Sequence, residues 1–497
     1  MRTIDKAISN TFYLFLDWLG VAVSGYLYWV IIGKLLQPAD AGVVSAFINF
    51  SLLISGLSTL GLLTAVSKLL PEYEIKGQKE KLVGTIWWTF KIIMLLNIII
   101  GILIVAANHI FGWFVYSTQY DAIALSLFLI TMTSSTLLST YLQSMQQMKR
   151  IFTSNLVLAI SKIIATLAFM TVSFNYIGPL AGFIAASALV TVIRFFWMPK
   201  GKGDIDTKGI RDLAIPSFMT IPGTLLVSNG SVIALTAIAT ASDVGLFGFA
   251  LIIASVIHIM PNVLSRSIFP ISSQQWAMKT TESLRRLLSL SLKYSILIAL
   301  PMVAFSFIFS NEIILLLSKQ SYIEAKNIVG ILAASFMFYG ISSIFTNTLY
   351  SMGEAKRNRD IWSAAGAINI GLTILLYSLY GISGAAFALL ISTIFIASLT
   401  IYFSIKKTGN FIHPKPIIKI IVSTCISFII TIILKQFFPG YIYAIPIALA
   451  FLFIYCVSLL LTRIFEKDDS LLIERLETKI PSYIKPIFNK LASFIPK

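Results

Sequence analysis

The stretch that decides the fold reads VGTIWWTFKIIMLLNIIIGILIVAA at residues 83–107, and it contains a single charged residue, Lys91. An α-helix rises 1.5 Å per residue, so a run of about 20 such residues crosses the ~30 Å hydrocarbon core of a bilayer. Other apolar runs of similar length follow one another along the chain. The fourteen predicted spans cover residues 9–35, 41–69, 83–107, 121–146, 152–174, 179–198, 213–240, 243–269, 285–309, 325–350, 360–380, 382–405, 416–438 and 443–464. The sequence therefore predicts an all-α polytopic membrane protein.

The composition of the whole chain agrees with a membrane protein. Hydrophobic residues make up 57% of the 497 residues and charged residues 12%, whereas a soluble domain carries about 25% charged residues. The net charge of +17 is spread over short loops without an aromatic-basic platform, so we expect no nucleic-acid partner. Cys425 and Cys456 lie in apolar runs without the spacing of a metal site or a disulfide, and we assign them no role.

The distribution of basic residues predicts the topology. Alternate loops place 31 of the 38 Lys and Arg residues on the side of the amino terminus and four on the other side, and three lie inside spans. Because cytoplasmic loops carry the excess of Lys and Arg, both termini are predicted to be cytoplasmic, with the protein in the cell membrane. The first apolar stretch lacks a small-residue cleavage site, so it is expected to remain as the first helix.

Short matches between the two halves of the chain indicate an internal repeat. Asp40–Gly42, before the second span, recurs as Asp243–Gly245 before the eighth, an offset of 203, and Gly178 recurs as Gly381 at the same offset. Six helices separate the copies, so the halves have the same orientation and are related by an axis along the membrane normal. The predicted organisation is a six-helix lobe at 1–199, a cytoplasmic linker at 200–212, a second six-helix lobe at 213–406, two further helices at 407–465 and a cytoplasmic amphipathic tail at 466–497.

Several of these segments carry a family resemblance. Gly33–Gly42, Leu60–Tyr73, Ser242–Phe247, Ile268–Ser272 and Tyr322–Ala325 resemble the polysaccharide and O-antigen flippase branch of the superfamily that also holds multidrug-and-toxin extruders and lipid II flippases. The resemblance implies two lobes around a central cavity and alternating access. It also implies a lipid-linked oligosaccharide substrate, made of a polyprenyl-type lipid, a phosphate or diphosphate and a glycan.

Catalytic motifs are missing from the sequence. There is no nucleophile elbow and no phosphate-cradling glycine loop. His109, His258 and His413 lie too far apart in sequence to indicate a local metal motif. We therefore expect a protein that is not an enzyme, without a cofactor or a metal site.

Charged residues deep inside predicted spans are the first candidates for a transport site. Counted from the cytoplasmic ends of their spans, Asp17, Lys91, Lys162, Lys293 and His258 lie about 12–17 Å deep. A charge at the bilayer centre costs roughly 2.5–3.5 kcal/mol on insertion scales, so such a residue usually faces a wet cavity or a partner. We predict that the three lysines and His258 bind substrate, with a structural role or snorkelling as the alternative.

Three other charged residues have alternative interpretations. Asp17 either binds a coupling ion, H⁺ or Na⁺, or neutralises a neighbouring lysine, and we favour the ion pair. Arg194 and Arg266 lie near span ends, where snorkelling is the expected behaviour. Arg266 remains a candidate substrate ligand because it lies about two turns below His258 on the same span.

Two spans carry polar stripes at helical spacing. On the fourth span the stripe consists of Thr133, Thr136, Thr140, Gln143 and Gln147. On the tenth span, the counterpart of the fourth, it consists of Ser335, Tyr339, Ser342, Thr346 and Tyr350. Small polar residues also join helices in membranes, so packing is the alternative for either stripe. Because the two stripes match, we predict that they line a cavity, with substrate contacts from Thr133, Thr136, Thr140, Gln143, Tyr339 and Thr346.

The start of the seventh span carries helix-weakening residues. Pro216, Pro222 and Gly223 predict a bent or unwound helix that acts as a hinge between the lobes, with an ordinary proline kink as the alternative.

These candidates combine into one hypothesis. The lysines attract the phosphate of the lipid carrier, the polar stripes replace water around the glycan, and the lipid tails remain among the membrane lipids.

A lipid II-type flippase and an H⁺- or Na⁺-coupled multidrug extruder share the expected architecture. An extruder of cations calls for deep carboxylates, and only Asp17 qualifies. A membrane-embedded glycosyltransferase would need acidic catalytic residues on a large loop outside the membrane, and the predicted loops are short.

Overall fold

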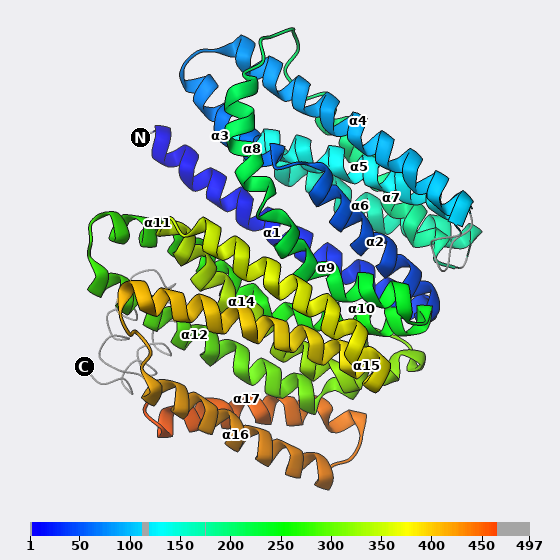
Figure 1. The fold of residues 1–497 in the computed structure, drawn as a ribbon. Coiled ribbons are helices and arrows are strands. Elements are labelled where there is room, and N and C mark those ends of the chain that lie inside the picture. Colours follow the sequence, from blue (N-terminus) through cyan, green and yellow to red (C-terminus); the bar gives the residue numbers. More distant parts are fainter. Residues whose placement is uncertain (1, 112–118, 174, 465–497) are drawn as a thin grey trace. The chain divides into compact units, whose positions relative to one another are not determined.

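The computed structural model describes residues 2–111, 119–173 and 175–464 (Figure 1). All regular elements in these ranges are helices, so the predicted all-α class is confirmed. The α-helices are α1 Arg2–Leu35, α2 Pro38–Ser58, α3 Leu62–Ile75, α4 Lys79–Phe111, α5 Gln119–Ser144, α6 Met148–Val172, α7 Ile177–Phe195, α8 Thr207–Phe218, α9 Ile221–Ile238, α10 Ala241–Ser255, α11 Ile259–Ala277, α12 Thr281–Ile308, α13 Ser310–Leu317, α14 Lys326–Ser351, α15 Ala355–Thr408, α16 Pro414–Phe437 and α17 Ala444–Leu461. Three short 3₁₀ helices, η1 Val256–His258, η2 Gln320–Ala325 and η3 Tyr441–Tyr443, lie between them. The predicted amphipathic tail at 466–497 lies outside the described residues.

The number of membrane spans agrees with the sequence prediction. Among the described residues, 12 helices are long and apolar enough to cross a membrane, and α1 adds a shorter apolar segment, Leu19–Leu35. α15 is one continuous element of 54 residues that bends at Gly381, where the backbone is not helical (φ 58°). Gly381 separates the two spans predicted at 360–380 and 382–405. With α15 counted as two spans and α1 as one, the described helices give the fourteen spans that the apolar runs predict.

The second predicted span, 41–69, is interrupted, which the apolar run did not indicate. Leu60 and Gly61 both have positive φ (48° and 75°) and separate α2 from α3. A Cβ atom on Gly61 would lie 2.2 Å from the carbonyl oxygen of Ala214 in α8. Glycine is therefore needed here both for its left-handed backbone and for the close approach of α8.

The chain forms two compact units, which are described separately. The first unit comprises the chain up to Ile253, together with Ile314–Ile328 and Lys356–Ser392. The second unit comprises Ala254–Ile313, Val329–Ala355 and the described residues from Thr393 to Ile464.

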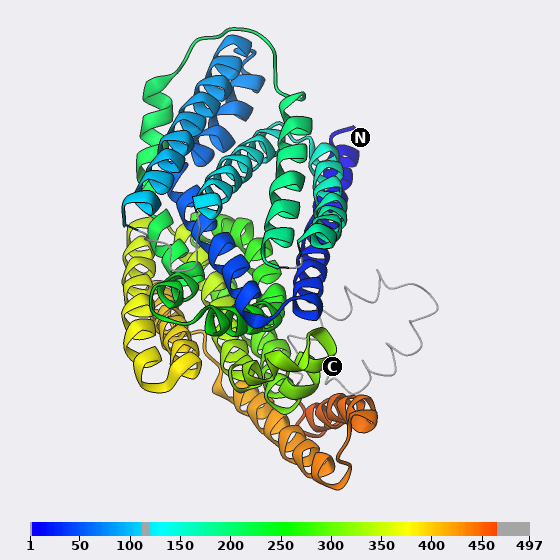
Figure 2. The ribbon, with the colours of Figure 1, turned by 90° about the vertical axis from the view of Figure 1, so that its right-hand side faces the viewer.

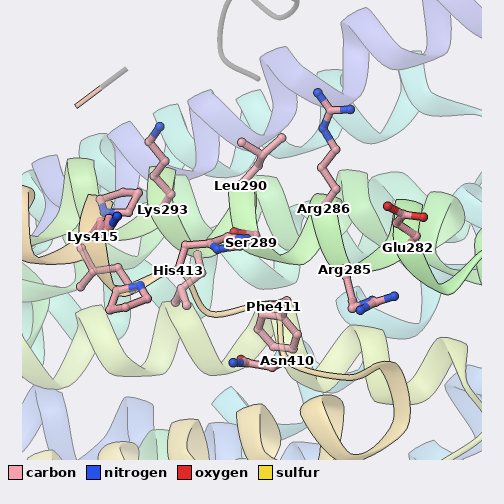
Figure 3. Close-up of a pocket in the computed structure, with 14 residues that line it drawn as sticks. Glu282, Arg285, Arg286, Ser289, Leu290, Lys293, Asn410, Phe411, His413 and Lys415 are labelled. Carbon is pink, nitrogen blue, oxygen red and sulfur yellow. The ribbon is translucent and has the colours of Figure 1, made fainter. Parts of the chain in front are cut away.

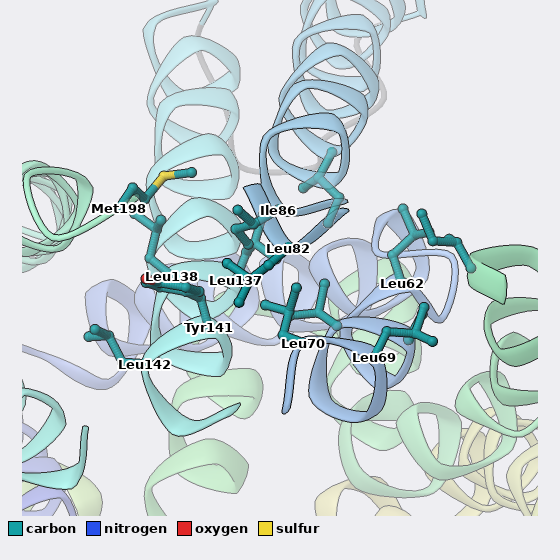
Figure 4. Packing of buried hydrophobic residues seen from close by; sticks show 14 of the residues in the cluster. Leu62, Leu69, Leu70, Leu82, Ile86, Leu137, Leu138, Tyr141, Leu142 and Met198 are labelled. Atoms are coloured by element: carbon teal, nitrogen blue, oxygen red, sulfur yellow. The ribbon is translucent and has the colours of Figure 1, made fainter. Parts of the chain in front are cut away.

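In the first unit, a buried cluster joins α3 to α4 and α5 (Figure 4). Figure 4 shows Leu69 and Leu70 of α3 close to Leu82 of α4 and to Leu137 and Tyr141 of α5. α3 also packs along α8, and α6 packs along α1 and α7. These contacts hold the short helices α3 and α8 against the long helices of the same unit.

The repeated Asp-X-Gly motif forms a reciprocal contact inside the first unit. A Cβ atom on Gly42 of α2 would lie 1.8 Å from the carbonyl oxygen of Ala241, and a Cβ atom on Gly245 of α10 would lie 1.8 Å from the carbonyl oxygen of Pro38. Pro38 and Ala241 are themselves separated by the repeat offset of 203. Such mutual contact between equivalent residues is what a two-fold rotation produces.

In the second unit, α16 and α17 form an antiparallel pair, visible in both ribbon views (Figures 1 and 2). α16 also packs along α12. At one end of this group, Lys435 of α16 forms an ion pair with Glu312 at 2.8 Å and donates a hydrogen bond to the carbonyl oxygen of Ile308 at 2.7 Å. Lys435 thus ties the last turn of α16 to the end of α12.

Candidate functional site

Lys162 of α6 is a buried cation beside two aromatic rings. Its side chain is 7% exposed, and its ammonium nitrogen lies 4.9 Å from the ring centroid of Tyr28 in α1 and 5.1 Å from that of Phe183 in α7. The Tyr28 hydroxyl donates a hydrogen bond to the Pro179 carbonyl oxygen at 3.2 Å, which fixes the ring. Ring faces attract a cation. No carboxylate among the described residues pairs with Lys162, so its positive charge is not neutralised there.

Asp17 of α1 lies in a polar cluster with Arg194 of α7. The side-chain amide of Asn155 in α6 donates to Asp17 Oδ1 at 2.7 Å, and its oxygen accepts from Arg194 Nη2. Arg194 Nε also donates to Ser154 Oγ at 3.0 Å, and its Nη1 donates to Ser135 Oγ at 2.7 Å. Asp17 is therefore linked through an amide to an arginine. The favoured pairing with a lysine does not occur among the described side chains.

The position of Arg194 corrects a prediction. The sequence predicts a snorkelling side chain near a span end, but Arg194 is 3% exposed. Its planar guanidinium carries five N–H donors in a fixed arrangement, and the acceptors on α5 and α6 match that arrangement. Depth along one helix does not reveal acceptors on neighbouring helices, so the sequence argument could not detect this site.

The other two predicted lysines have different surroundings. Lys91 lies on the exposed side of α4 in the first unit. Lys293 of α12, in the second unit, is 6% exposed, and its ammonium nitrogen lies 5.9 Å from the ring centroid of Tyr294. The three lysines thus differ: Lys91 is exposed, Lys162 is buried beside two aromatic rings, and Lys293 is buried near the ring of Tyr294.

The polar stripe on α5 divides into two parts. Thr133 is fully buried, and its hydroxyl donates to Ser55 Oγ of α2 at 2.9 Å and to Asn97 Oδ1 of α4 at 3.3 Å. This is the geometry of helix packing. Thr136 and Gln143 are exposed, and Thr140, between them, is partly exposed. The exposed part of the stripe retains side chains that are available to a substrate.

The predicted residues of the second unit are partly brought together. The ring of His258 stacks on Phe336 of α14 at 5.3 Å and meets Tyr339 edge-on at 5.8 Å. Thr346, two turns further along α14, is 8% exposed. Arg266 is exposed on α11. His258 and Tyr339 therefore share one site, while Arg266 faces outward.

Metal binding has no support in the described part of the chain. No group of three or more His, Cys, Asp or Glu side chains in residues 2–111, 119–173 and 175–464 is arranged to hold a metal ion.

Comparison with known proteins identifies the family. Residues 7–276 match the model of a family described as polysaccharide biosynthesis protein, which is more than half of the 497 residues. The chain belongs to the polysaccharide biosynthesis protein family. Residues 216–374 of this family member also match the MatE family model.

This polysaccharide biosynthesis protein family member shares its fold with solved transporters. The lipid II flippase MurJ, in an inward closed conformation, is similar at a TM-score of 0.72 and 17% identity, covering 91% of this chain and 98% of that chain. An inward-facing multidrug resistance MATE family transporter of the MOP superfamily is similar at a TM-score of 0.64 and 16% identity. The match covers 81% of this chain and 95% of that chain. A membrane protein described as uncharacterized, MJ1068 of Methanocaldococcus jannaschii, is 22% identical over 79% of this chain and 82% of its own length. The predicted resemblance and fold are confirmed.

The helix weakness predicted at the seventh span is present in this family member. The helix breaks after Phe218, and α9 begins at Ile221 with Pro222 in its first turn, while Pro216 lies inside α8. A Cβ atom on Gly223 would lie 2.6 Å from the backbone nitrogen of Ser363 in α15. The helix is thus interrupted at this position, and the role of these residues as a hinge stays a prediction.

Two polar clusters escaped the sequence argument. In the first unit, Asn97 Oδ1 accepts from Ser58 Oγ at 3.2 Å in addition to Thr133. In the second unit, Ser265 Oγ of α11 donates to the carbonyl oxygen of Ser343 at 2.6 Å and accepts from Asn347 Nδ2 of α14 at 2.8 Å. Each helix contributes only one or two of these residues, so no periodic pattern marks them.

Proposed function

We propose that this chain moves a lipid-linked oligosaccharide, carried on a polyprenyl phosphate or diphosphate, from the cytoplasmic to the outer leaflet of the cell membrane by alternating access. The product would serve the synthesis of cell-surface polysaccharide or of glycoprotein glycans. The family membership supports a role in polysaccharide biosynthesis. The MurJ-like fold supports movement of a lipid-linked sugar.

The observation that carries this proposal is Lys162. A lysine that is 7% exposed among membrane helices, with aromatic rings as neighbours and no carboxylate partner among the described residues, is costly to keep charged. A phosphate group would compensate that charge and would itself be stabilised by it. In this proposal Lys91 and Lys293 contribute further positive charge, and Thr136, Thr140 and Gln143 bind the glycan.

The proposed architecture keeps the lobes predicted from the repeat, at 1–199 and 213–406, with both termini in the cytoplasm. The reciprocal contact of Gly42 and Gly245 supports a two-fold relation between the repeats. Rocking of the lobes would use the break before Pro222 as its hinge.

The test is a flipping assay in liposomes. Purified protein is reconstituted with a fluorescent lipid-linked oligosaccharide, and the fraction of label reached by a membrane-impermeant quencher is followed with time. We expect Lys162→Gln to slow flipping at least tenfold. Lys149→Gln, which removes a charge from an exposed position at the start of α6, should flip at the parent rate. Equal rates for Lys162→Gln and its control would remove Lys162 from the mechanism.

Multidrug-and-toxin extrusion coupled to H⁺ or Na⁺ is the second candidate function. The MatE match at residues 216–374 and the MATE-like fold favour it. Asp17 would then be the ion-binding residue, and its hydrogen bond to Asn155 would change when the ion binds. Export of a cationic dye against a proton or sodium gradient, with no flipping of lipid-linked sugar, would select this function over the first.

A further inference from the structure

A basic cavity of about 720 Å³ lies in the second unit at the start of α12 (Figure 3). Its walls are the first three turns of α12, the segment 410–413 and the first turn of α16. Its volume is in the range of about 300–1,000 Å³ that is typical of small-molecule sites. Apart from Lys293, neither the predicted transport site nor the polar stripes contribute to it.

The wall formed by residues 409–413 is fixed by its own contacts. α15 ends at Thr408, and Gly409 turns the chain with φ 88°. The ring of Phe411 is 1% exposed and stacks on Phe345 of α14 at 5.4 Å. The backbone N–H of Ile412 donates to Asn410 Oδ1 at 3.0 Å. The segment is therefore held in place and presents the start of α16 to the cavity.

The cavity carries an excess of positive charge. Four of its lining residues are basic, namely Arg285, Arg286, Lys293 and Lys415, and one, Glu282, is acidic. Figure 3 shows Arg286 and Lys293 projecting from the same side of α12, with Lys415 and His413 at the Lys293 end. Seven residues separate Arg286 from Lys293, which is about 10 Å along the helix. The cationic groups that line the cavity are thus spread over a distance larger than the diameter of a single small ion.

Arg285 supplies the observation that points to a ligand. Its Nε atom is buried and donates no hydrogen bond to any described residue. Buried N–H groups are almost always satisfied by protein, water or a ligand. The guanidinium lies against Gly409, where a Cβ atom would be 3.6 Å from Nη1. An acceptor inside the cavity would complete the hydrogen bonds of this side chain.

The start of α16 adds a second attraction for an anion. α16 is 24 residues long, and His413 at its amino-terminal cap makes no side-chain capping bond. Pro414 and Pro416 have no backbone N–H, so Lys415 supplies the one N–H donor among the first three residues of α16, and the helix dipole also favours negative charge. An arginine side chain and a helix N-terminus together bind an anionic phosphate oxygen more strongly than they bind a neutral group.

We propose that this cavity binds the phosphate of an anionic membrane lipid. α12 and α16 are both candidate membrane spans, so the cavity at their first turns lies at the level where lipid phosphates are found. Beyond the first turn of α16, Ile418, Ile421 and Val422 are 56%, 45% and 43% exposed and offer an apolar surface to the lipid chains. The inference does not depend on the proposed transport function, because bulk phospholipid and a polyprenyl phosphate carry the same group.

The test is lipid retention by the full-length protein in neutral detergent, measured by native mass spectrometry. Phosphatidylglycerol, phosphatidylcholine and a polyprenyl phosphate are titrated separately. The Arg285→Gln/Lys415→Gln variant should lose affinity for the anionic lipids at least tenfold, because it removes two charged donors. The matched control, Lys279→Gln/Lys406→Gln, removes two exposed lysines that do not line the cavity and should bind like the parent.

The outcomes separate the sources of the phosphate. Loss of phosphatidylglycerol binding identifies bulk lipid as the occupant, and loss of polyprenyl phosphate binding alone identifies the carrier lipid. Unchanged binding of both anionic lipids by the cavity variant would overturn the proposal. Binding of inorganic pyrophosphate without retention of any lipid would also overturn it, since the site would then serve a soluble anion. Should the double variant fail to fold, Lys415→Glu alters an exposed side chain and is expected to weaken anionic lipid binding in the same assay.

Discussion

Gly42 and Gly245 lie at equivalent positions of α2 and α10. Gly42 leaves room for the carbonyl group of Ala241, four residues before Gly245, and Gly245 leaves room for the carbonyl group of Pro38, four residues before Gly42. A Cβ atom on either glycine would lie 1.8 Å from that carbonyl oxygen. A motif that looks like a simple turn signal in the sequence is therefore a close contact between two helix starts. The Asp residue of each copy is also engaged, since Asp243 Oδ2 accepts from the Tyr377 hydroxyl at 2.7 Å and Asp40 Oδ1 accepts from the backbone of Tyr176.

Adding a methyl group at this contact should destabilise the first unit. Gly42→Ala and Gly245→Ala each force the two helix starts apart, with an expected cost of about 1–3 kcal/mol. The melting temperature in detergent should fall for both variants. Gly371→Ala is the matched control, because its Cβ atom would meet nothing within 4 Å, and alanine is favoured over glycine in a helix by about 1 kcal/mol. A stability of Gly42→Ala equal to that of Gly371→Ala would contradict the close contact.

Removing Arg194 should destabilise the protein more than removing an exposed arginine. Arg194→Ala leaves Asp17 and Asn155 without their buried partner, and breaking such a cluster costs about 3 kcal/mol or more. Arg211→Ala is the control, since Arg211 forms an exposed pair with Asp212 at 3.8 Å, and exposed pairs contribute about 0–1 kcal/mol. Thermal unfolding followed by tryptophan fluorescence would measure both. Similar melting temperatures for the two variants would show that the hydrogen bonds of Arg194 do not stabilise the folded protein.

The sequence predicted which segments are helices better than it predicted their partners. The bend at Gly381 falls at the boundary between the predicted spans 360–380 and 382–405, and the break before α9 lies next to Pro222, so both positions carry a local signal in the sequence. The break at Gly61 was missed, because hydropathy does not respond to a change in backbone φ. The burial of Arg194 and of Thr133 was also missed, since their hydrogen-bond partners come from other helices.

A pH effect is expected where the segment before α8 meets α3. Asp206 accepts a hydrogen bond from the backbone N–H of Gly209 at 2.9 Å and from the Tyr73 hydroxyl at 3.0 Å. These bonds, the backbone bond first, lower the pKa of Asp206 below its usual 3.8. Burial and Asp206 raise the pKa of the Tyr73 hydroxyl to about 12.

The sign of each effect follows from the direction of its pKa shift. The stability from Asp206 is present above pH 4 and is lost as the pH falls through the lowered pKa of Asp206. The stability from Tyr73 is present below its ordinary pKa of about 10 and is lost as the pH rises through about 12. Asp206→Ala should lower stability near neutral pH by about 1 kcal/mol, as loss of a helix cap does. In a series of melting temperatures measured against pH, this variant should also show a smaller fall at acidic pH than the parent. Asp212→Ala, which alters a residue of α8 itself, should show the same fall as the parent.

The division of the α5 stripe yields a contrast between two threonines. Thr133→Val removes hydrogen bonds to Ser55 and Asn97 and leaves buried oxygens with fewer partners, so we expect a loss of about 1–2 kcal/mol in stability. Thr136→Val alters an exposed side chain whose hydroxyl donates, among the described residues, to the Met132 carbonyl oxygen of its own helix. Its stability should change by less than about 0.5 kcal/mol. If the exposed part of the stripe contacts the glycan, Thr136→Val reduces flipping at unchanged stability. The reverse pattern, with a stable Thr133→Val that no longer flips its substrate, would place the binding surface on the buried side of α5.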